Sequence, residues 1–144
     1  MRVVIDIPSE DPVALVERAW GLVEGVVLIN LSIMRRVRIP PLYTAGVPYM
    51  NEPDGPEEFA NCLQVLGLAP RLARPGKWAD CDDAVAYRVA ELRMKGEPAQ
   101  ARIVWRKMAR HSKHAQVRRG DGSIEDPCMI LRRNQQEGRI GCVV

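Results

Sequence analysis

The chain has 144 residues, of which 47% are hydrophobic and 27% are charged, and its formal net charge is +3. This length and balance are typical of one folded domain, and they exclude a disordered or low-complexity chain. The most apolar run, residues 25–34, is too short to cross a bilayer. The four cysteines are widely spaced without a C-x-x-C pair, so we expect a reducing, cytoplasmic location and no disulfide framework.

The N-terminal part is predicted to hold a strand and a long helix. Residues 2–7 alternate and are β-branched, as in a strand. Asp11-Pro12 then has the form of a helix cap followed by proline at the first helical position. Apolar residues recur at helical spacing behind it as far as Met34, which favours a helix there, although the valines and isoleucines would also suit a strand.

The middle of the chain is predicted to hold a loop and a second helix. Residues 40–55 begin with two prolines and are rich in Pro, Gly and Tyr, which indicates an ordered loop. Gly55-Pro56 is expected to open the helix, because the acidic residues that follow suit a positive N-terminal end. The expected buried face and closing residue of this helix are Phe59, Cys62, Leu63, Leu66 and then Gly67.

A third helix and an antiparallel sheet are predicted to follow. Asp82 and Asp83 occupy a first helical turn, and Gly96 ends the helix; its apolar face is Cys81, Val85, Val89 and Leu92. Residues 101–108 and 115–118 alternate as strands, and Asp121-Gly122 is a hairpin signal. A third strand is expected around Ile124, with residues 129–131 as its continuation. Helices followed by an antiparallel sheet indicate an α+β fold of one domain, residues 1–144.

Cys81 is the candidate nucleophile because it lies where the third helix begins. Unsatisfied backbone N–H groups there favour a thiolate and can also hold an oxyanion. The neighbouring acids Asp80, Asp82 and Asp83 act against a thiolate, so a cationic partner is needed. A histidine would supply that charge and serve as general base and acid.

Two histidines and two acids are candidates for the remaining roles. His114 opens a strand and is favoured over His111, which lies in the expected connecting loop. Asp126 follows the hairpin turn on the returning segment and is expected to orient the imidazole. Asp121 is the weaker alternative, because turn acids commonly bond their own backbone.

Three segments together resemble a known superfamily. Residues 78–84 (Trp-Ala-Asp-Cys-Asp-Asp-Ala) resemble the nucleophile helix of transglutaminase-like and papain-like cysteine proteases. Residues 114–117 and Asp126-Pro127 resemble the His and Asp strands of that superfamily, in its Cys, His, Asp order. The loop from Pro40 to Tyr49 resembles small phage-encoded members, so the resemblance covers about residues 40–131 and leaves a C-terminal tail, 132–144.

The resemblance implies a nucleophile helix packed on a small antiparallel sheet, with Cys81, His114 and Asp126 as a catalytic triad. It also implies acyl transfer on amide bonds of a protein or peptide substrate, by hydrolysis or by transfer to an amine. Tyr49, Asn51 and Trp78 are the candidates for the oxyanion side chain and for substrate binding. The chain departs from the pattern at Ala79, where glycine is common, and at Cys128, a second thiol near the site.

Other interpretations of the same residues stay open. The chain is alternatively a virion or assembly structural protein that retains the fold, which would give it virion partners or self-association through the tail. We expect no cofactor and no metal, because His111, His114, Cys81 and Cys128 lack the paired spacing of a zinc site. A nucleic-acid role would depend only on the basic residues between Arg102 and Arg119. No feature of the sequence favours a membrane role.

Overall fold

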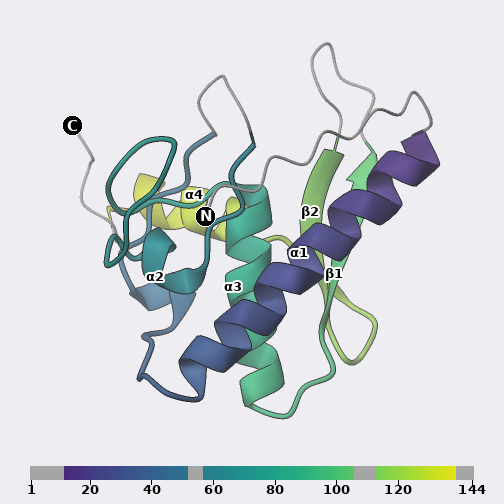
Figure 1. Cartoon of the computed structure of the whole chain (residues 1–144), viewed down its shortest axis with the longest axis horizontal. Coiled ribbons are helices and arrows are strands. Elements are labelled where there is room, and N and C mark those ends of the chain that lie inside the picture. Colours follow the sequence, from purple (N-terminus) through teal and green to yellow (C-terminus); the bar gives the residue numbers. More distant parts are fainter. Residues whose placement is uncertain (1–11, 52–56, 106–112, 139–144) are drawn as a thin grey trace.

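The computed structural model describes residues 12–51, 57–105 and 113–138. Within these ranges the chain forms three α-helices, then an antiparallel sheet, then a fourth α-helix, so the predicted α+β class is confirmed (Figure 1). The strand predicted over residues 2–7 and the ends of two other predicted elements, Gly55-Pro56 and residues 106–108, lie outside the described residues.

The first helix, α1 (Pro12–Met34), is continuous over 23 residues, which confirms the helix predicted there. Apolar residues at helical spacing, among them Val23 and Val27, bury its inner face against α3 and β1. Polar contacts fix its position as well, because the Glu24 carboxylate accepts hydrogen bonds from Arg93 at 2.8 Å and from the Ala101 backbone at 3.0 Å. This helix therefore belongs to the core although it precedes the part that the resemblance covers.

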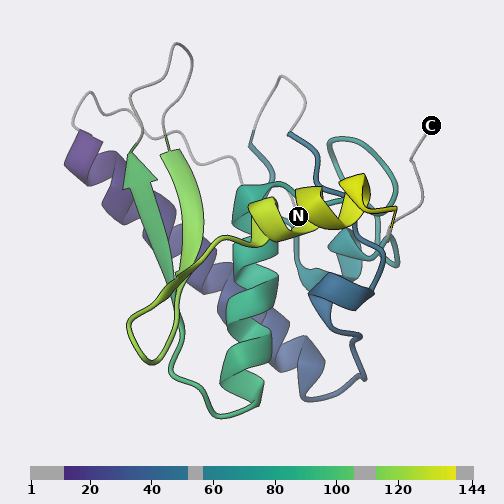
Figure 2. The same cartoon turned by 180° about the vertical axis from the view of Figure 1, so that it is seen from behind.

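The helix α3 (Cys81–Met94) runs through the middle of the fold and is buried on most sides (Figures 1 and 2). Val85 and Val89 face a hydrophobic cluster shared with α1 and the sheet. Ala84 and Tyr87 face a second cluster under the 3-10 helix η1 (Leu42–Thr44) and α4. Because both clusters meet on α3, its N-terminal end is held in a fixed place.

The sheet has the strand order β1 (Gln100–Trp105), β2 (Lys113–Arg118), β3 (Ile124–Glu125), all antiparallel. The predicted hairpin turn is confirmed, since Gly122 has a φ of 87° between β2 and β3. Ala101 pairs with Val117 and Ile103 with Ala115, and these four side chains form the buried face. His114, which pairs with Val104, therefore lies near the beginning of β2 on a rigid element.

Two predicted elements are wrong in extent or type. The second helix, α2 (Cys62–Val65), has only four residues because Asn61 caps it by accepting hydrogen bonds from the Leu63 and Gln64 backbones. Residues 129–131 are helical rather than extended, since Asp126 and Pro127 begin the helix α4 (Pro127–Gln136). The predicted tail from residue 132 thus starts inside α4, and its last six residues, 139–144, lie outside the described ranges.

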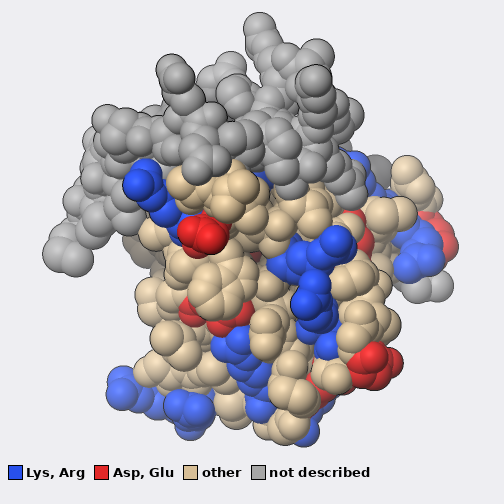
Figure 3. Space-filling model, turned by 90° about the vertical axis from the view of Figure 1, so that its right-hand side faces the viewer, with Lys and Arg blue, Asp and Glu red and all other residues tan. Residues whose placement is uncertain are grey.

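Three basic residues of the stretch from Arg102 to Arg119 have polar partners in the described part of the chain. Arg102 donates to Gln116, Lys113 bonds Glu57, and Arg119 bonds Glu97 and Glu125. Figure 3 accordingly shows acidic side chains beside basic ones on one side of the molecule. Among the described residues, no helix combines the length and apolar character that a bilayer crossing requires.

Candidate active site

Cys81 is the first residue of α3, and the local sequence explains how the helix begins there. The Asp80 carboxylate accepts a hydrogen bond from the Asp83 backbone N–H at 3.0 Å. The Asp83 carboxylate in turn accepts one from the Asp80 backbone N–H at 3.5 Å. This reciprocal capping box satisfies backbone donors of the first turn. The thiol is half-buried beside that turn, so the chain holds it at the N-terminal end of a well-capped helix.

His114 and Asp126 meet through a short hydrogen bond. Nε2 of His114 lies 2.6 Å from Oδ2 of Asp126, and both side chains are largely buried. The second carboxylate oxygen, Oδ1, caps α4 by accepting from the Cys128 and Met129 backbones at 3.2 and 3.3 Å. Asp126 therefore orients the imidazole with one oxygen and begins a helix with the other.

The pKa of the Cys81 thiol is governed by the same imidazole and by a second thiol, that of Cys128. Since Nε2 of His114 faces Asp126, Nδ1 is the ring nitrogen left to interact with the sulfur. A hydrogen bond from the Cys128 thiol, with those from His114 and the Ala115 backbone, outweighs burial and lowers the pKa of Cys81 to about 4. The sulfur is therefore a thiolate across the neutral pH range.

The pKa of the His114 imidazole is shifted in the opposite direction to that of Cys81. Its hydrogen bond to Asp126, followed by the one to Cys81, raises the pKa of His114 to about 9, although burial acts in the opposite direction. Burial also opposes the charged form of Asp126, but the His114 partner keeps the pKa of this carboxyl below its ordinary value. Between about pH 4 and pH 9 the site thus holds a thiolate–imidazolium pair beside a carboxylate.

A second carboxyl group lies close to the thiol and has a cation beside it. Oδ1 of Asp82 is 3.8 Å from the Cys81 sulfur, and burial followed by that sulfur's charge raises the pKa of Asp82 well above its usual range. Nζ of Lys113 lies 3.7 Å from Oδ2 of Asp82 and acts against this shift. Lys113 precedes His114 in β2, so the same strand places both cations by the nucleophile.

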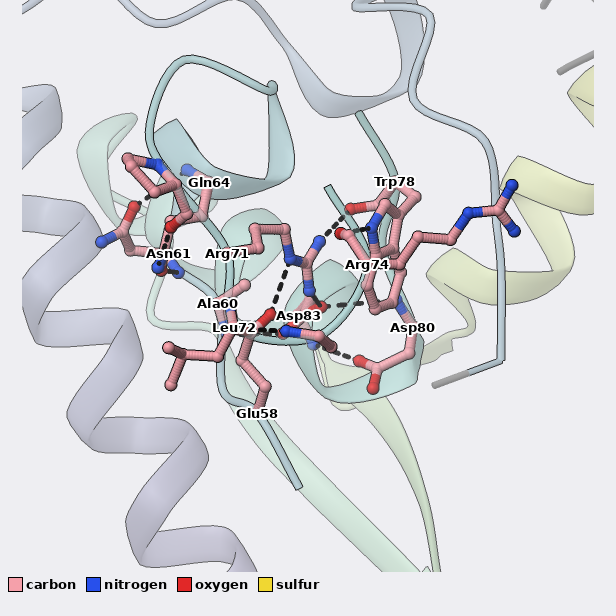
Figure 4. A network of polar contacts seen from close by, with 12 residues as sticks. Glu58, Ala60, Asn61, Gln64, Arg71, Leu72, Arg74, Trp78, Asp80 and Asp83 are labelled. Atoms are coloured by element: carbon pink, nitrogen blue, oxygen red, sulfur yellow. Dashed lines mark hydrogen bonds and ion pairs between the residues drawn. The ribbon is translucent and has the colours of Figure 1, made fainter. Parts of the chain in front are cut away.

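A buried arginine network braces the beginning of α3 (Figure 4). Arg71 donates to Glu58 at 2.7 Å, to the Trp78 carbonyl at 2.7 Å and to Asp83 at 2.8 Å. Its side chain is only 1% exposed and its guanidinium lies 3.5 Å above the Trp78 ring. The network joins the loop before α3 to the capping box that positions Cys81. Sequence reasoning missed this role, because Arg71 lies in a segment that has the composition of an ordinary basic loop.

The three candidate substrate-binding residues lie in different surroundings. Trp78 is buried, and its indole N–H donates to the Arg74 carbonyl at 2.7 Å. Tyr49 pairs through its backbone with Ala79, and its half-buried phenol donates to Asn51 at 2.9 Å. Burial, followed by the charges of Cys128 and Cys81, raises the pKa of Tyr49 to about 12. Tyr49 thus lies near the thiols and its exposed partner Asn51 lies at the surface, whereas Trp78 supports the loop from inside.

The two roles of Asp126 can be separated by substitution. Both Asp126→Ala and Asp126→Asn are expected to lower the free energy of unfolding, because both remove the charged partner of His114. Asp126→Ala should lower it by about 1 kcal/mol more than Asp126→Asn does, because only alanine also removes the N-cap of α4, whereas asparagine caps helices as well as aspartate does. Urea titration followed by circular dichroism measures both variants, and an equal loss in the two would contradict a cap role.

Among the described residues, no group of three or more His, Cys, Asp and Glu side chains is arranged to hold a metal ion. The zinc alternative also included His111, which lies outside those residues. Comparisons with protein-family models, with curated proteins and with solved structures found no match to this chain.

Proposed function

We propose that the chain is a cysteine-dependent acyl-transfer enzyme of the transglutaminase-like or papain-like type, acting on amide bonds of a protein or peptide. The observation that carries the proposal is the 2.6 Å contact between His114 and Asp126, beside a Cys81 thiol whose pKa His114 helps to lower to about 4. A nucleophile, a general base and a group that orients the base are the three parts such catalysis requires.

In the proposed reaction the Cys81 thiolate attacks the amide carbonyl carbon and forms a tetrahedral oxyanion. Backbone N–H groups in the first turn of α3 would stabilise its negative charge. The His114 imidazolium then gives its proton to the amide nitrogen, the C–N bond breaks, and the amine leaves a thioester on Cys81. Water or a second amine attacks the thioester, His114 takes the proton from it, and the thiolate leaves.

The remaining side chains have supporting roles in this proposal. Asp126 keeps the imidazole oriented with Nδ1 toward the sulfur and stabilises its positive charge. Lys113 offsets the acidic surroundings that Asp82 creates beside the thiolate. Tyr49 and Asn51 are the side chains proposed to contact the substrate, because Tyr49 lies near the thiol and its hydrogen-bond partner Asn51 is exposed at the surface.

An activated ester tests the acylation step without knowledge of the natural substrate. We expect p-nitrophenyl acetate to release a burst of one nitrophenolate per chain and to acetylate Cys81. Each cysteine lies in a separate tryptic peptide, so mass spectrometry assigns the label; the peptides are 39–71, 78–88, 120–132 and 140–144. Cys62 is the internal control, because burial raises the pKa of its thiol to about 11.

Cys81→Ser is the matched variant for this assay, since serine keeps the shape of the side chain. It is expected to abolish the burst while the circular dichroism spectrum and thermal midpoint stay close to those of the unchanged protein. Acetylation of Cys62 at the rate of Cys81 would refute the proposal. Added methylamine then separates the two fates of the thioester, since hydrolysis yields acetate and transfer yields N-methylacetamide.

A further inference from the structure

Cys128 is a second thiol placed against the nucleophile. It is the second residue of α4, is 2% exposed, and belongs to the hydrophobic cluster against which Cys81 packs. The N-terminal ends of α3 and α4 meet at this point, as the crossing of the two helices shows (Figure 2). The two cysteines therefore meet at one packed cluster although they lie 47 positions apart in the sequence.

The two thiols also influence each other electrostatically, since Cys128 is the first cause that lowers the pKa of Cys81 and Cys81 is the first cause that raises the pKa of Cys128. Asp126 fixes the backbone of Cys128 through its cap contact at 3.2 Å, and the same carboxylate fixes His114. Cys62 shares the hydrophobic cluster, but its backbone N–H is bound to the Asn30 side chain on α1 and its thiol is fully buried. Cys128 is thus the thiol best placed to react with an oxidised Cys81.

We propose that Cys81 and Cys128 form a reversible disulfide when the protein meets a hydroperoxide, and that this modification switches the nucleophile off. As regulation of acyl transfer the inference rests on the proposed function, whereas the oxidation itself needs only the two thiols. Both cysteines are free thiols in the structure.

The oxidation proceeds in two balanced steps. The Cys81 thiolate attacks one oxygen of hydrogen peroxide, the O–O bond breaks, and the hydroxide that leaves takes a proton from the His114 imidazolium to form water. The Cys128 sulfur then attacks the resulting sulfenic acid, so the S–S bond forms and the S–O bond breaks. The hydroxide leaves with the Cys128 proton as a second water.

Oxidation of Cys81 in the first step makes it easier for Cys128 to react in the second. In the resting site, the hydrogen bond to Cys81, burial and the thiolate charge all raise the pKa of Cys128. Conversion of Cys81 to a neutral sulfenic acid removes that charge, so Cys128 loses its proton more readily than before. A buried thiol adjacent to a reactive cysteine also shields it from further, irreversible oxidation.

Peptide mapping after oxidation tests the proposal on the full chain. The protein is treated with a small excess of hydrogen peroxide at pH 7, free thiols are blocked with iodoacetamide, and the protein is digested without reductant. We expect peptide 78–88 to be cross-linked to peptide 120–132, and dithiothreitol to restore both peptides and the nitrophenyl acetate burst. Linkage of peptide 78–88 to 39–71 or 140–144 would overturn the inference, as would Cys81 sulfinic acid beside a free Cys128.

Two variants sharpen the result. In Cys128→Ser the sulfenic acid on Cys81 is expected to be trapped by dimedone and to advance to a sulfinic acid that dithiothreitol does not reduce. In the matched control Cys62→Ser the cross-link is expected to form as before; its loss there, or its formation in Cys128→Ser, would refute the assignment. A cross-link in a protein that p-nitrophenyl acetate does not acylate would uphold the disulfide and reject the proposed function.

Discussion

Replacing His114 by alanine is expected to reduce the acid-range reactivity of Cys81 and to abolish the proposed acyl transfer. In the unchanged protein the pKa of Cys81 is lowered to about 4, so its alkylation by iodoacetamide should be nearly constant from pH 5 to pH 8. Without the imidazolium, the thiol loses two of the interactions that hold its pKa down, keeps those of Cys128 and the Ala115 backbone, and is still subject to burial, so its pKa should rise toward the ordinary value. Alkylation of the variant should then rise with pH over this range, by at most about tenfold per pH unit.

The size of the effect follows from two opposing factors. At pH 5.5 a thiol with an ordinary pKa of about 8.5 is only about one part in a thousand thiolate. A more basic thiolate is also more nucleophilic, and over about four pKa units this recovers roughly a factor of 50 to 100. Because the pKa-lowering effect of Cys128 remains in the variant, this is the largest change expected: alkylation at pH 5.5 should fall by up to about tenfold in His114→Ala, with a larger relative loss at lower pH.

His111→Ala is the matched control, because the chain has only two histidines. It should leave the alkylation profile flat, and a profile that changes in His111→Ala but not in His114→Ala would reverse the assignment. The pKa of His114, about 9, sets the upper pH limit of the proposed amide turnover. Amide turnover should decline above it, because the leaving amine then lacks a proton donor, whereas alkylation needs only the thiolate and should not decline.

The parts of the site predictable from sequence are those set by local signals. Asp82 and Asp83 in a first turn, with Gly96 after an apolar face, sufficed to place Cys81 where a helix begins. The Asp121-Gly122 turn sufficed to bring the segment after it back beside β2. Each of these signals acts within a few residues, so tertiary packing had little scope to override it.

The element after the hairpin shows where the same reasoning failed. Asp126-Pro127 has the cap-and-proline form that predicted α1 from Asp11-Pro12, yet a strand was expected to continue beyond it. The cap signal alone would have placed Asp126 at the beginning of a helix and Cys128 inside its first turn. It could not have shown that α4 begins beside α3, because that depends on packing between distant segments.

The predicted extent of the second helix was wrong for a different reason. Glu57 and Glu58 suit the first turn of a helix, but Asn61 provides the stronger cap, with a reciprocal hydrogen bond from Gln64, and the helix begins after it. Glu58 instead turns toward Arg71, which is 13 positions away. No local pattern marks a contact of that separation, so neither the buried arginine nor its acidic partners were predictable from the sequence alone.

Arg71→Met is expected to destabilise the fold more than any substitution at the catalytic residues, by about 3–5 kcal/mol in the free energy of unfolding. Methionine fills much of the same volume but leaves the carboxylates of Glu58 and Asp83 buried without their cation. The guanidinium also covers the Trp78 ring and donates a hydrogen bond to the Trp78 backbone carbonyl, and both contacts would be lost. Urea titration measures the change, and a loss below about 1 kcal/mol would show that the network contributes little.

The pH dependence of that loss identifies its cause. Burial raises the pKa of Asp83 to about 6 even with Arg71 present to lower it, so removing Arg71 should raise the pKa further. A carboxyl whose pKa is higher in the folded state than in the unfolded one favours folding when protonated, so stability falls as the pH rises. The defect of Arg71→Met should therefore be smaller at pH 5 than at pH 8. Arg35→Met, an exposed position just after α1, should change stability by less than about 0.5 kcal/mol at either pH, and equal defects at the two positions would assign the loss to charge reduction rather than to the buried network.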